Sequence, residues 1–265
     1  MKKGKFLCVI SLLFASAIAL SNAALLVNAW SPTQGKKADS KQEIEKEYLP
    51  ITDYNGSESV SALSDKAGQE PRRARSSRYD NRRPQPISEL PVGTEELPMN
   101  THWGWQLTTL PISQSDAVVI GDILDAQAHL SLDRTGIYSE FKIQIKEVLN
   151  DRTQASLFVG EQITVEREGG AVRFPSGRIQ QYRVTNQFMP RVGRQFLLFL
   201  RHNEDGQDYS ILTGYELRGN RVTPLDNLEQ FNLYKGTEQT TFLNTVREAI
   251  AHPTQTNPRT GGEVR

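Results

Sequence analysis

Short apolar runs between turn-forming sequences predict a protein built mainly of β-strands. Residues 117–120 are continuously apolar, as in a strand that is buried on both faces. Residues 141–146 alternate between apolar and polar side chains, which predicts one buried and one solvated face. Residues 162–168 alternate in the same way, and Gly169 and Gly170 end that strand. Alternation of this kind is typical of antiparallel sheets.

The following segment contains a predicted hairpin and the most apolar strand. Residues 171–174 and 179–184 flank the turn sequence Pro-Ser-Gly-Arg at 175–178. Residues 196–200, Phe-Leu-Leu-Phe-Leu, predict a central strand, and further turns and strands follow between residues 209 and 222. About eight strands at this spacing favour a barrel or sandwich over a parallel sheet with crossover helices.

One helix is predicted near the C-terminus. It begins with Thr237 as N-cap and ends before Pro253. Apolar residues recur inside it at helical spacing: Phe242, Leu243, Val246, Ala249 and Ile250. We interpret residues 253–265 as a flexible tail.

Residues 1–29 have the pattern of a signal peptide or signal anchor. Three lysines in the first five residues precede an uncharged stretch at 6–29. Small residues offer cleavage sites after Ala23 and Ala29, but the stretch is also long enough to remain as a membrane anchor. Both alternatives place the rest of the chain outside the cytoplasm, in the periplasm, at the cell surface or secreted. The only cysteine, Cys8, lies in this stretch, so the remaining chain has no thiol or disulfide chemistry.

Residues 30–100 are predicted to form a disordered, charged linker, because they lack a sustained apolar period. Residues 101–252 then form the β-rich globular domain. Six arginines lie between Arg72 and Arg83, and such a run indicates either a solvated segment or a contact with a polyanion or the cell envelope. Trp103 and Trp105 are expected either to pack on the domain edge or to form a ligand platform.

Several strand segments together resemble a known family. They resemble the netrin-like module, the oligonucleotide/oligosaccharide-binding (OB) type of barrel that tissue inhibitors of metalloproteinases also use. They also resemble a set of exported bacterial β-domain proteins with no assigned activity. The segments are residues 115–121, 141–149, 160–165, 192–200 and, for the bacterial set, 209–217.

The resemblance covers about residues 113–227 and implies an OB-like antiparallel barrel or small sandwich with one C-terminal helix. The inhibitors bind their target enzymes through an N-terminal cysteine that has no counterpart in this chain. The resemblance therefore does not imply protease inhibition.

Charge and motifs restrict the chemistry. Lys and Arg total 31, as do Asp and Glu, so no whole-chain field attracts nucleic acid or an acidic membrane. The four histidines are not at metal-ligand spacing, and the sequence has no nucleophile elbow and no phosphate-binding glycine-rich loop. We expect no cofactor and no metal.

Glu166 and Glu168 share one face of a predicted strand, at a spacing near that of inverting glycosidase carboxylates. The alternative is a solvated strand end with Arg167 on the opposite face.

The predicted hairpin carries the candidate binding residues Arg173, Arg178 and Tyr182. If Phe174 pairs with Ile179, then Arg173 pairs with Gln180 on the outer face, next to Tyr182. Two arginines and an aromatic ring could then hold an anionic polymer. The alternative is that the arginines only solvate the hairpin.

These observations predict an exported, non-catalytic binding or interaction module of the cell envelope, whose partner is an envelope protein or an anionic polymer. The alternative is an extracytoplasmic hydrolase with a site assembled from distant residues. Nucleic acid is not expected as a partner, because the chain is predicted to be exported.

Overall fold

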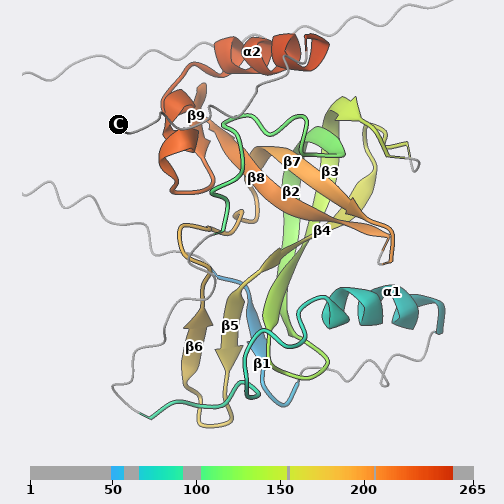
Figure 1. Cartoon of the computed structure of the whole chain (residues 1–265), viewed down its shortest axis with the longest axis vertical. Coiled ribbons are helices and arrows are strands. Elements are labelled where there is room, and N and C mark those ends of the chain that lie inside the picture. The colour runs from blue at the N-terminus through green and yellow to red at the C-terminus, as the bar shows by residue number, and fades with distance from the viewer. Residues whose placement is uncertain (1–48, 57–65, 92–102, 154–155, 206, 253–265) are drawn as a thin grey trace, which may run out of the picture. The chain divides into compact units, whose positions relative to one another are not determined.

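In the computed structural model, most of the predicted strands form one six-stranded sheet, and the predicted hairpin lies in a second sheet (Figure 1). Neighbouring strands in the six-stranded sheet are antiparallel. The strand at one edge, β4, also pairs in parallel with β8, through Val165 with Tyr209 and Glu166 with Ser210. The order is β4 (Gln162–Glu168), β3 (Ile137–Asp151), β2 (Ala117–Leu130), β7 (Gln195–Asn203), β8 (Asp208–Arg218) and β9 (Arg221–Pro224).

The structure describes residues 49–56, 66–91, 103–153, 156–205 and 207–252. The chain divides into two units, Met1–Gln42 and Glu43–Arg265, and all described residues belong to the second unit. The predicted signal segment at 1–29 and the tail at 253–265 therefore lie outside the described residues. Among the helices that are described, none has the length and apolar character needed to cross a bilayer.

The predominance of strands, the antiparallel sheets and the C-terminal helix confirm the coarse prediction of fold class. The predicted central strand at 196–200 is part of β7, which lies between β2 and β8. None of its five side chains is more than 1% exposed. Its apolar run has no polar alternation because residues on both faces of this strand are covered.

Two apolar layers lie on the two faces of the sheet. One contains Phe141, Ile143 and Leu198, and the other contains Phe199 and Tyr215. The second layer is covered by α2 (Gln239–Ala251) through three buried side chains, Phe242, Leu243 and Val246. The short 3₁₀-helix η2 (Glu229–Tyr234) precedes α2 and buries Phe231.

The predicted late helix is present, but its N-cap is Glu238 rather than Thr237. The Glu238 carboxylate accepts a hydrogen bond from the backbone N–H of Thr241 at 2.7 Å. This contact satisfies an amide in the first turn that has no partner within the helix.

A second, three-stranded sheet has the order β1 (Ile51–Asp53), β5 (Gly170–Arg173) and β6 (Ile179–Tyr182). β5 and β6 form the predicted hairpin, and β1 pairs with β5 in parallel. The predicted register is wrong by one residue, because Arg173 pairs with Ile179 and Val172 pairs with Gln180. The Phe174 N–H bonds to the Arg178 carbonyl and closes the turn.

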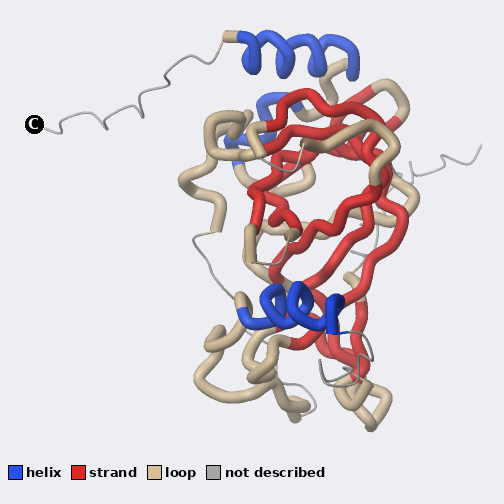
Figure 2. Tube along the Cα trace, turned by 90° about the vertical axis from the view of Figure 1, so that its right-hand side faces the viewer, coloured by secondary structure: helices blue, strands red, loops and turns tan. Residues whose placement is uncertain are grey.

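The structure corrects the linker assignment of residues 30–100 where they are described. β1 and α1 (Lys66–Ser77) lie within this range, and Leu49, Tyr79 and Ile87 are buried. Figure 2 shows α1 lying across the strands. These residues lack an apolar period because ion pairs, ring stacking and single apolar anchors hold them in place.

Gly136 shows how closely this segment approaches the hairpin between β2 and β3. A Cβ atom at Gly136 would lie 2.1 Å from the carbonyl oxygen of Tyr79. Any side chain at this position would push the segment after α1 away from the sheet.

Candidate functional site

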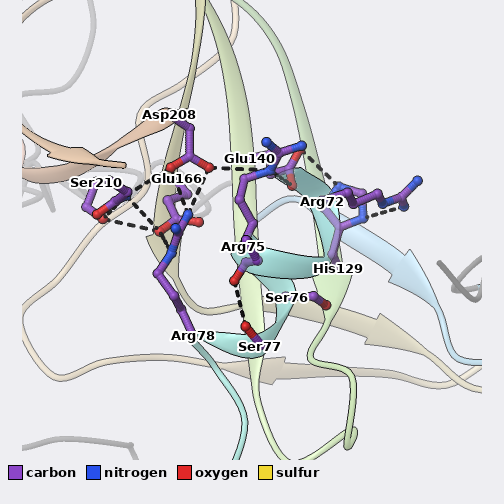
Figure 3. A network of polar contacts seen from close by, with 12 residues as sticks. Arg72, Arg75, Ser76, Ser77, Arg78, His129, Glu140, Glu166, Asp208 and Ser210 are labelled. Carbon is purple, nitrogen blue, oxygen red and sulfur yellow. Dashed lines mark hydrogen bonds and ion pairs between the residues drawn. The ribbon is translucent and has the colours of Figure 1, made fainter. Parts of the chain in front are cut away.

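The helix α1 carries arginines on the side that faces the sheet. Its sequence, KAGQEPRRARSS, has no apolar stripe. Arg72 and Arg75 are three residues apart, and Arg78 follows one turn later, so all three project from one side. Figure 3 shows Arg75 and Arg78 pointing toward Glu140, Glu166 and Asp208. We call these three carboxylates, which come from β3, β4 and β8, the acidic face.

Arg75 joins two strands through the acidic face. Its Nε lies 2.8 Å from Glu140 Oε1 and 3.4 Å from Asp208 Oδ2. The Arg75 side chain is only 15% exposed. Solvent therefore screens this contact less than a surface ion pair.

Arg78 makes the most extensive contacts with the acidic face. Its Nε donates to Glu166 Oε1 at 2.9 Å, and one terminal nitrogen reaches both Asp208 carboxylate oxygens, at 2.7 and 2.8 Å. The other terminal nitrogen pairs with Asp205. The planar guanidinium group can hold several carboxylates at once, which an ammonium group cannot do in a fixed geometry.

Glu166 and Asp208 are each only 1% exposed, and neutral groups also bind them. The Asn203 side-chain amide donates to Glu166 at 3.3 Å and to Asp208 at 3.0 Å, and the Ser210 hydroxyl donates to Glu166 at 3.2 Å. Ser210 stands opposite Glu166 because β4 pairs with β8. Among the described residues, Glu166 Oε2 has no hydrogen-bond partner.

Burial raises the pKa of two carboxyl groups of the acidic face, Glu166 and Asp208. It raises the pKa of Glu166 from 4.5 to about 7, and the neighbouring Asp208 charge adds to this, while Arg78 opposes it. Burial also raises the pKa of Asp208, again against Arg78. Burial lowers the pKa of Arg78, but the hydrogen bond and charge of Glu166 outweigh it and leave that pKa above its usual value.

Contacts on both sides of the acidic face extend the docking of α1 and the residues after it. Arg72 lies 3.2 Å from His129 Nδ1, and burial lowers the pKa of His129. The ring of Tyr79 stacks on Tyr138, with centroids 4.6 Å apart and planes 5° apart. Arg82 Nε is 3.6 Å from a carboxylate oxygen of Glu168.

The arginine run at 72–83 is therefore solvated only in part: Arg73 and Arg82 are exposed, whereas Arg75 and Arg78 are partly buried. Its members Arg75 and Arg78 bind carboxylates of the protein itself.

The alternative of a solvated strand end is wrong, because both the Glu166 and the Glu168 side chains are largely covered. Glu166 is bound by Arg78, and the Glu168 side chain is 13% exposed. Arg167 is on the opposite face, as predicted, but it is buried and its ion pair with Asp226 is 2.6 Å long.

The structure separates the predicted binding residues of the hairpin. Arg173 is exposed and lies 3.3 Å from Asp53 of β1. Arg178 donates to the Leu90 carbonyl at 2.6 Å and lies 3.4 Å from Glu89. Local carboxylates therefore pair with both charges.

Tyr182 does not form the predicted exposed stacking surface. It is 1% exposed and belongs to the buried cluster that includes Ile87 and Phe174. The Arg83 guanidinium covers its ring at 4.5 Å from the centroid. The segment after α1 covers this ring. The sequence of the hairpin alone could not predict this contact, because the covering residues lie far away in the chain.

The two tryptophans before β2 differ in their environment. Trp103 packs against the Arg167 guanidinium, 4.9 Å from the ring centroid, whereas Trp105 is 63% exposed. Packing at the domain edge therefore describes Trp103, while most of the Trp105 side chain faces solvent.

No protein-family model matches the chain, and no curated protein matches it in sequence. Within the part of the chain that the structure describes, no group of three or more His, Cys, Asp or Glu side chains is placed to hold a metal ion.

Proposed function

We propose that this chain is an exported, non-catalytic interaction module of the cell envelope, whose OB-like barrel binds an arginine-rich polypeptide segment on its acidic face. α1 occupies this face from within the chain. The partner is an envelope protein, or a second copy of this chain, that presents a segment of the same chemistry.

The strand pairings support an OB-like barrel. β4 pairs with both β3 and β8, so β2, β3, β4, β8 and β7 follow one another in a closed circuit. All pairs in this circuit are antiparallel except the closing pair. Five strands in such a circuit fit the Greek-key barrel of the OB fold.

The main support for the proposal is that two buried carboxylates are bound by guanidinium groups. Glu166 and Asp208 are almost completely buried, and Arg78 binds both. Removing one partner of a buried ion pair typically costs about 3–5 kcal/mol, because a charge stays buried without compensation. In their ionised forms, Glu166 and Asp208 therefore require a cation, and the geometry of their contacts favours arginine.

α1 fits the role of an exchangeable ligand, because apolar burial contributes little to its docking. Its arginine contacts can be reproduced by another arginine-rich helix. Its hydroxyl contact, from Ser76 to the Leu130 carbonyl at 3.1 Å, is a single neutral hydrogen bond worth about 1 kcal/mol.

The hydrolase alternative has less support. Of the two carboxylates that would serve as acid and base, Glu166 binds Arg78, and Glu168 lies 3.6 Å from Arg82. The anionic-polymer site on the hairpin has also lost support, because Arg173 and Arg178 lie near carboxylates and Tyr182 is buried.

Export is supported by the sequence of residues 1–29, with its basic start and its uncharged stretch. The chain is either released after cleavage or tethered by this segment, and both alternatives place the domain outside the cytoplasm.

A peptide titration tests the proposal. A labelled peptide of residues 66–83 is titrated against the chain and against the variant Arg75→Ala/Arg78→Ala, with fluorescence anisotropy as readout. We expect the peptide to bind the variant, whose acidic face is open, and to bind the unchanged chain at least about tenfold more weakly.

Two matched controls separate specific recognition from charge attraction. A peptide that carries Arg75→Lys and Arg78→Lys keeps its charge and should bind more weakly. Adding Glu166→Gln and Asp208→Asn to the variant should abolish binding, and a melting curve shows that each variant is folded. Binding that survives these two changes would contradict the proposal.

A further inference from the structure

A hollow of about 380 Å³ lies apart from the acidic face. It is lined by residues 103–107, together with Arg201 of β7 and Leu212 of β8. Leu212 belongs to the apolar layer that α2 covers, and Leu107 packs against the same layer. The hollow therefore lies where the segment before β2 meets the sheet.

A fixed turn positions the tryptophans at this hollow. Gly104 has a φ of +77°, and a Cβ atom there would lie 2.7 Å from Leu228 Cδ1, so the turn requires glycine. The Gly104 carbonyl accepts hydrogen bonds from Leu107 N at 3.0 Å and from Gln230 Nε2 at 3.1 Å. The site is thus preorganised by contacts to distant residues.

The turn places the two indole rings differently. The Arg167 guanidinium lies against Trp103, and the Arg167–Asp226 ion pair fixes that guanidinium from behind. Trp105 remains 63% exposed beside the hollow. A large aromatic side chain that is mostly exposed at the edge of a hollow offers a stacking surface to a ligand.

The charge of the hollow is positive. Its lining includes the exposed Arg201 and contains no Asp or Glu. Among the described residues, Arg201 forms no ion pair with a carboxylate. Arg173 and Arg178 differ in this respect, since each lies within ion-pair distance of a carboxylate.

We propose that this hollow binds an acidic saccharide unit, with the sugar ring stacked on Trp105 and its carboxylate or sulfate group held by Arg201. The electron-rich face of an indole attracts the polarised C–H groups of a sugar ring. A guanidinium group binds a carboxylate or sulfate through two parallel hydrogen bonds. The exposed amide of Gln106 can bond to the hydroxyl groups at the ring edge.

This site is independent of the acidic face. The two proposals use different residues and ligands of opposite charge, so one can fail while the other holds. The arginine-plus-aromatic chemistry expected on the hairpin is here carried by Arg201 and Trp105.

The test is a titration of the full chain with trigalacturonate at low ionic strength, followed by tryptophan fluorescence and calorimetry. We expect saturable binding, with an affinity that falls as salt is added. Trp105→Ala and Arg201→Ala should each weaken binding by about tenfold or more. Matched controls are Phe158→Ala, which removes an aromatic ring that is 62% exposed, and Arg73→Ala, which removes an exposed arginine of α1. Both controls should bind as the unchanged chain does.

Three results would overturn the inference. The first is the absence of saturable binding at millimolar trigalacturonate. The second is unchanged binding in Trp105→Ala and in Arg201→Ala, with melting curves that show both variants folded. The third is equal or tighter binding of neutral maltotriose or of adenosine monophosphate, which would assign the hollow to a different ligand chemistry.

Discussion

Glu166 lies on β4 with its carboxylate in the space between the sheet and α1. Strand alternation places Val165 in the apolar layer and Glu166 on the other side, where a carboxylate would normally be hydrated. Arg78 takes the place of water there, and Asn203 and Ser210 supply further donors. The charge of this residue is therefore stabilised by groups from three separate segments of the chain.

The raised pKa of Glu166 gives a pH dependence with a definite sign. The folded state binds this proton more tightly than the unfolded chain, so the contribution of Glu166 to the free energy of unfolding falls as pH rises from 4.5 toward about 7. The Glu166→Gln variant has no carboxyl group at this position, so its free energy of unfolding does not fall for this reason as pH rises. We therefore expect the free energy of unfolding of this variant to improve relative to the unchanged chain between about pH 5 and about pH 8.

Urea unfolding at the two pH values measures this difference. Glu147→Gln is the control, because Glu147 is a carboxylate with a 42% exposed side chain in an ion pair with Arg247. Its difference from the unchanged chain should vary little with pH. A Glu166→Gln difference that is equally constant would mean that Glu166 titrates as a solvated residue.

At the scale of elements, the strands were predictable and α1 was not. The apolar run of β7 predicts a buried strand because its cover comes from both faces, whatever the neighbouring elements are. The helix α1 has no apolar face, and its ligands lie far away in sequence, such as Glu166 at a separation of 88 residues from Arg78. No local pattern encodes a partner at that distance.

The same limit explains the predicted hairpin site. Alternation predicted the hairpin and its approximate turn, but the pairing of the two strands differs by one residue from the predicted register. Tyr182 is buried because Arg83 and Ile87, from a distant segment, cover its ring. A signal for the acidic face was present in the three-residue spacing of Arg72, Arg75 and Arg78. This spacing predicts a contact only if the buried carboxylates of the acidic face are already known.

Residues 30–100 should contribute to stability, contrary to their interpretation as a linker. A chain without them loses the stacking of Tyr79 on Tyr138, the cover of Tyr182 and the cations of the acidic face. We expect its melting temperature to fall by more than about 10 °C, or cooperative unfolding to disappear. An unchanged melting temperature, measured by calorimetry, would restore the linker interpretation.

At the scale of the whole molecule, a net charge of zero conceals two local charge patterns. Arg75 and Arg78 pair with the acidic face, while Arg201 at the hollow forms no ion pair with a carboxylate among the described residues. The proposed module therefore has one surface for a basic segment and another for an acidic ligand, on a domain with no whole-chain field.

The central claim is that buried ion pairs hold α1 on the acidic face, and a double-mutant cycle between Arg78 and Glu166 tests it most directly. The Arg247–Glu147 pair is a matched reference, because its N–O distance is also 2.9 Å but both side chains are more than 40% exposed. With both cycles measured by urea unfolding at about pH 8, we expect a coupling free energy above about 1.5 kcal/mol for Arg78–Glu166 and below about 1 kcal/mol for the reference. Equal, small coupling in the two cycles would contradict the account.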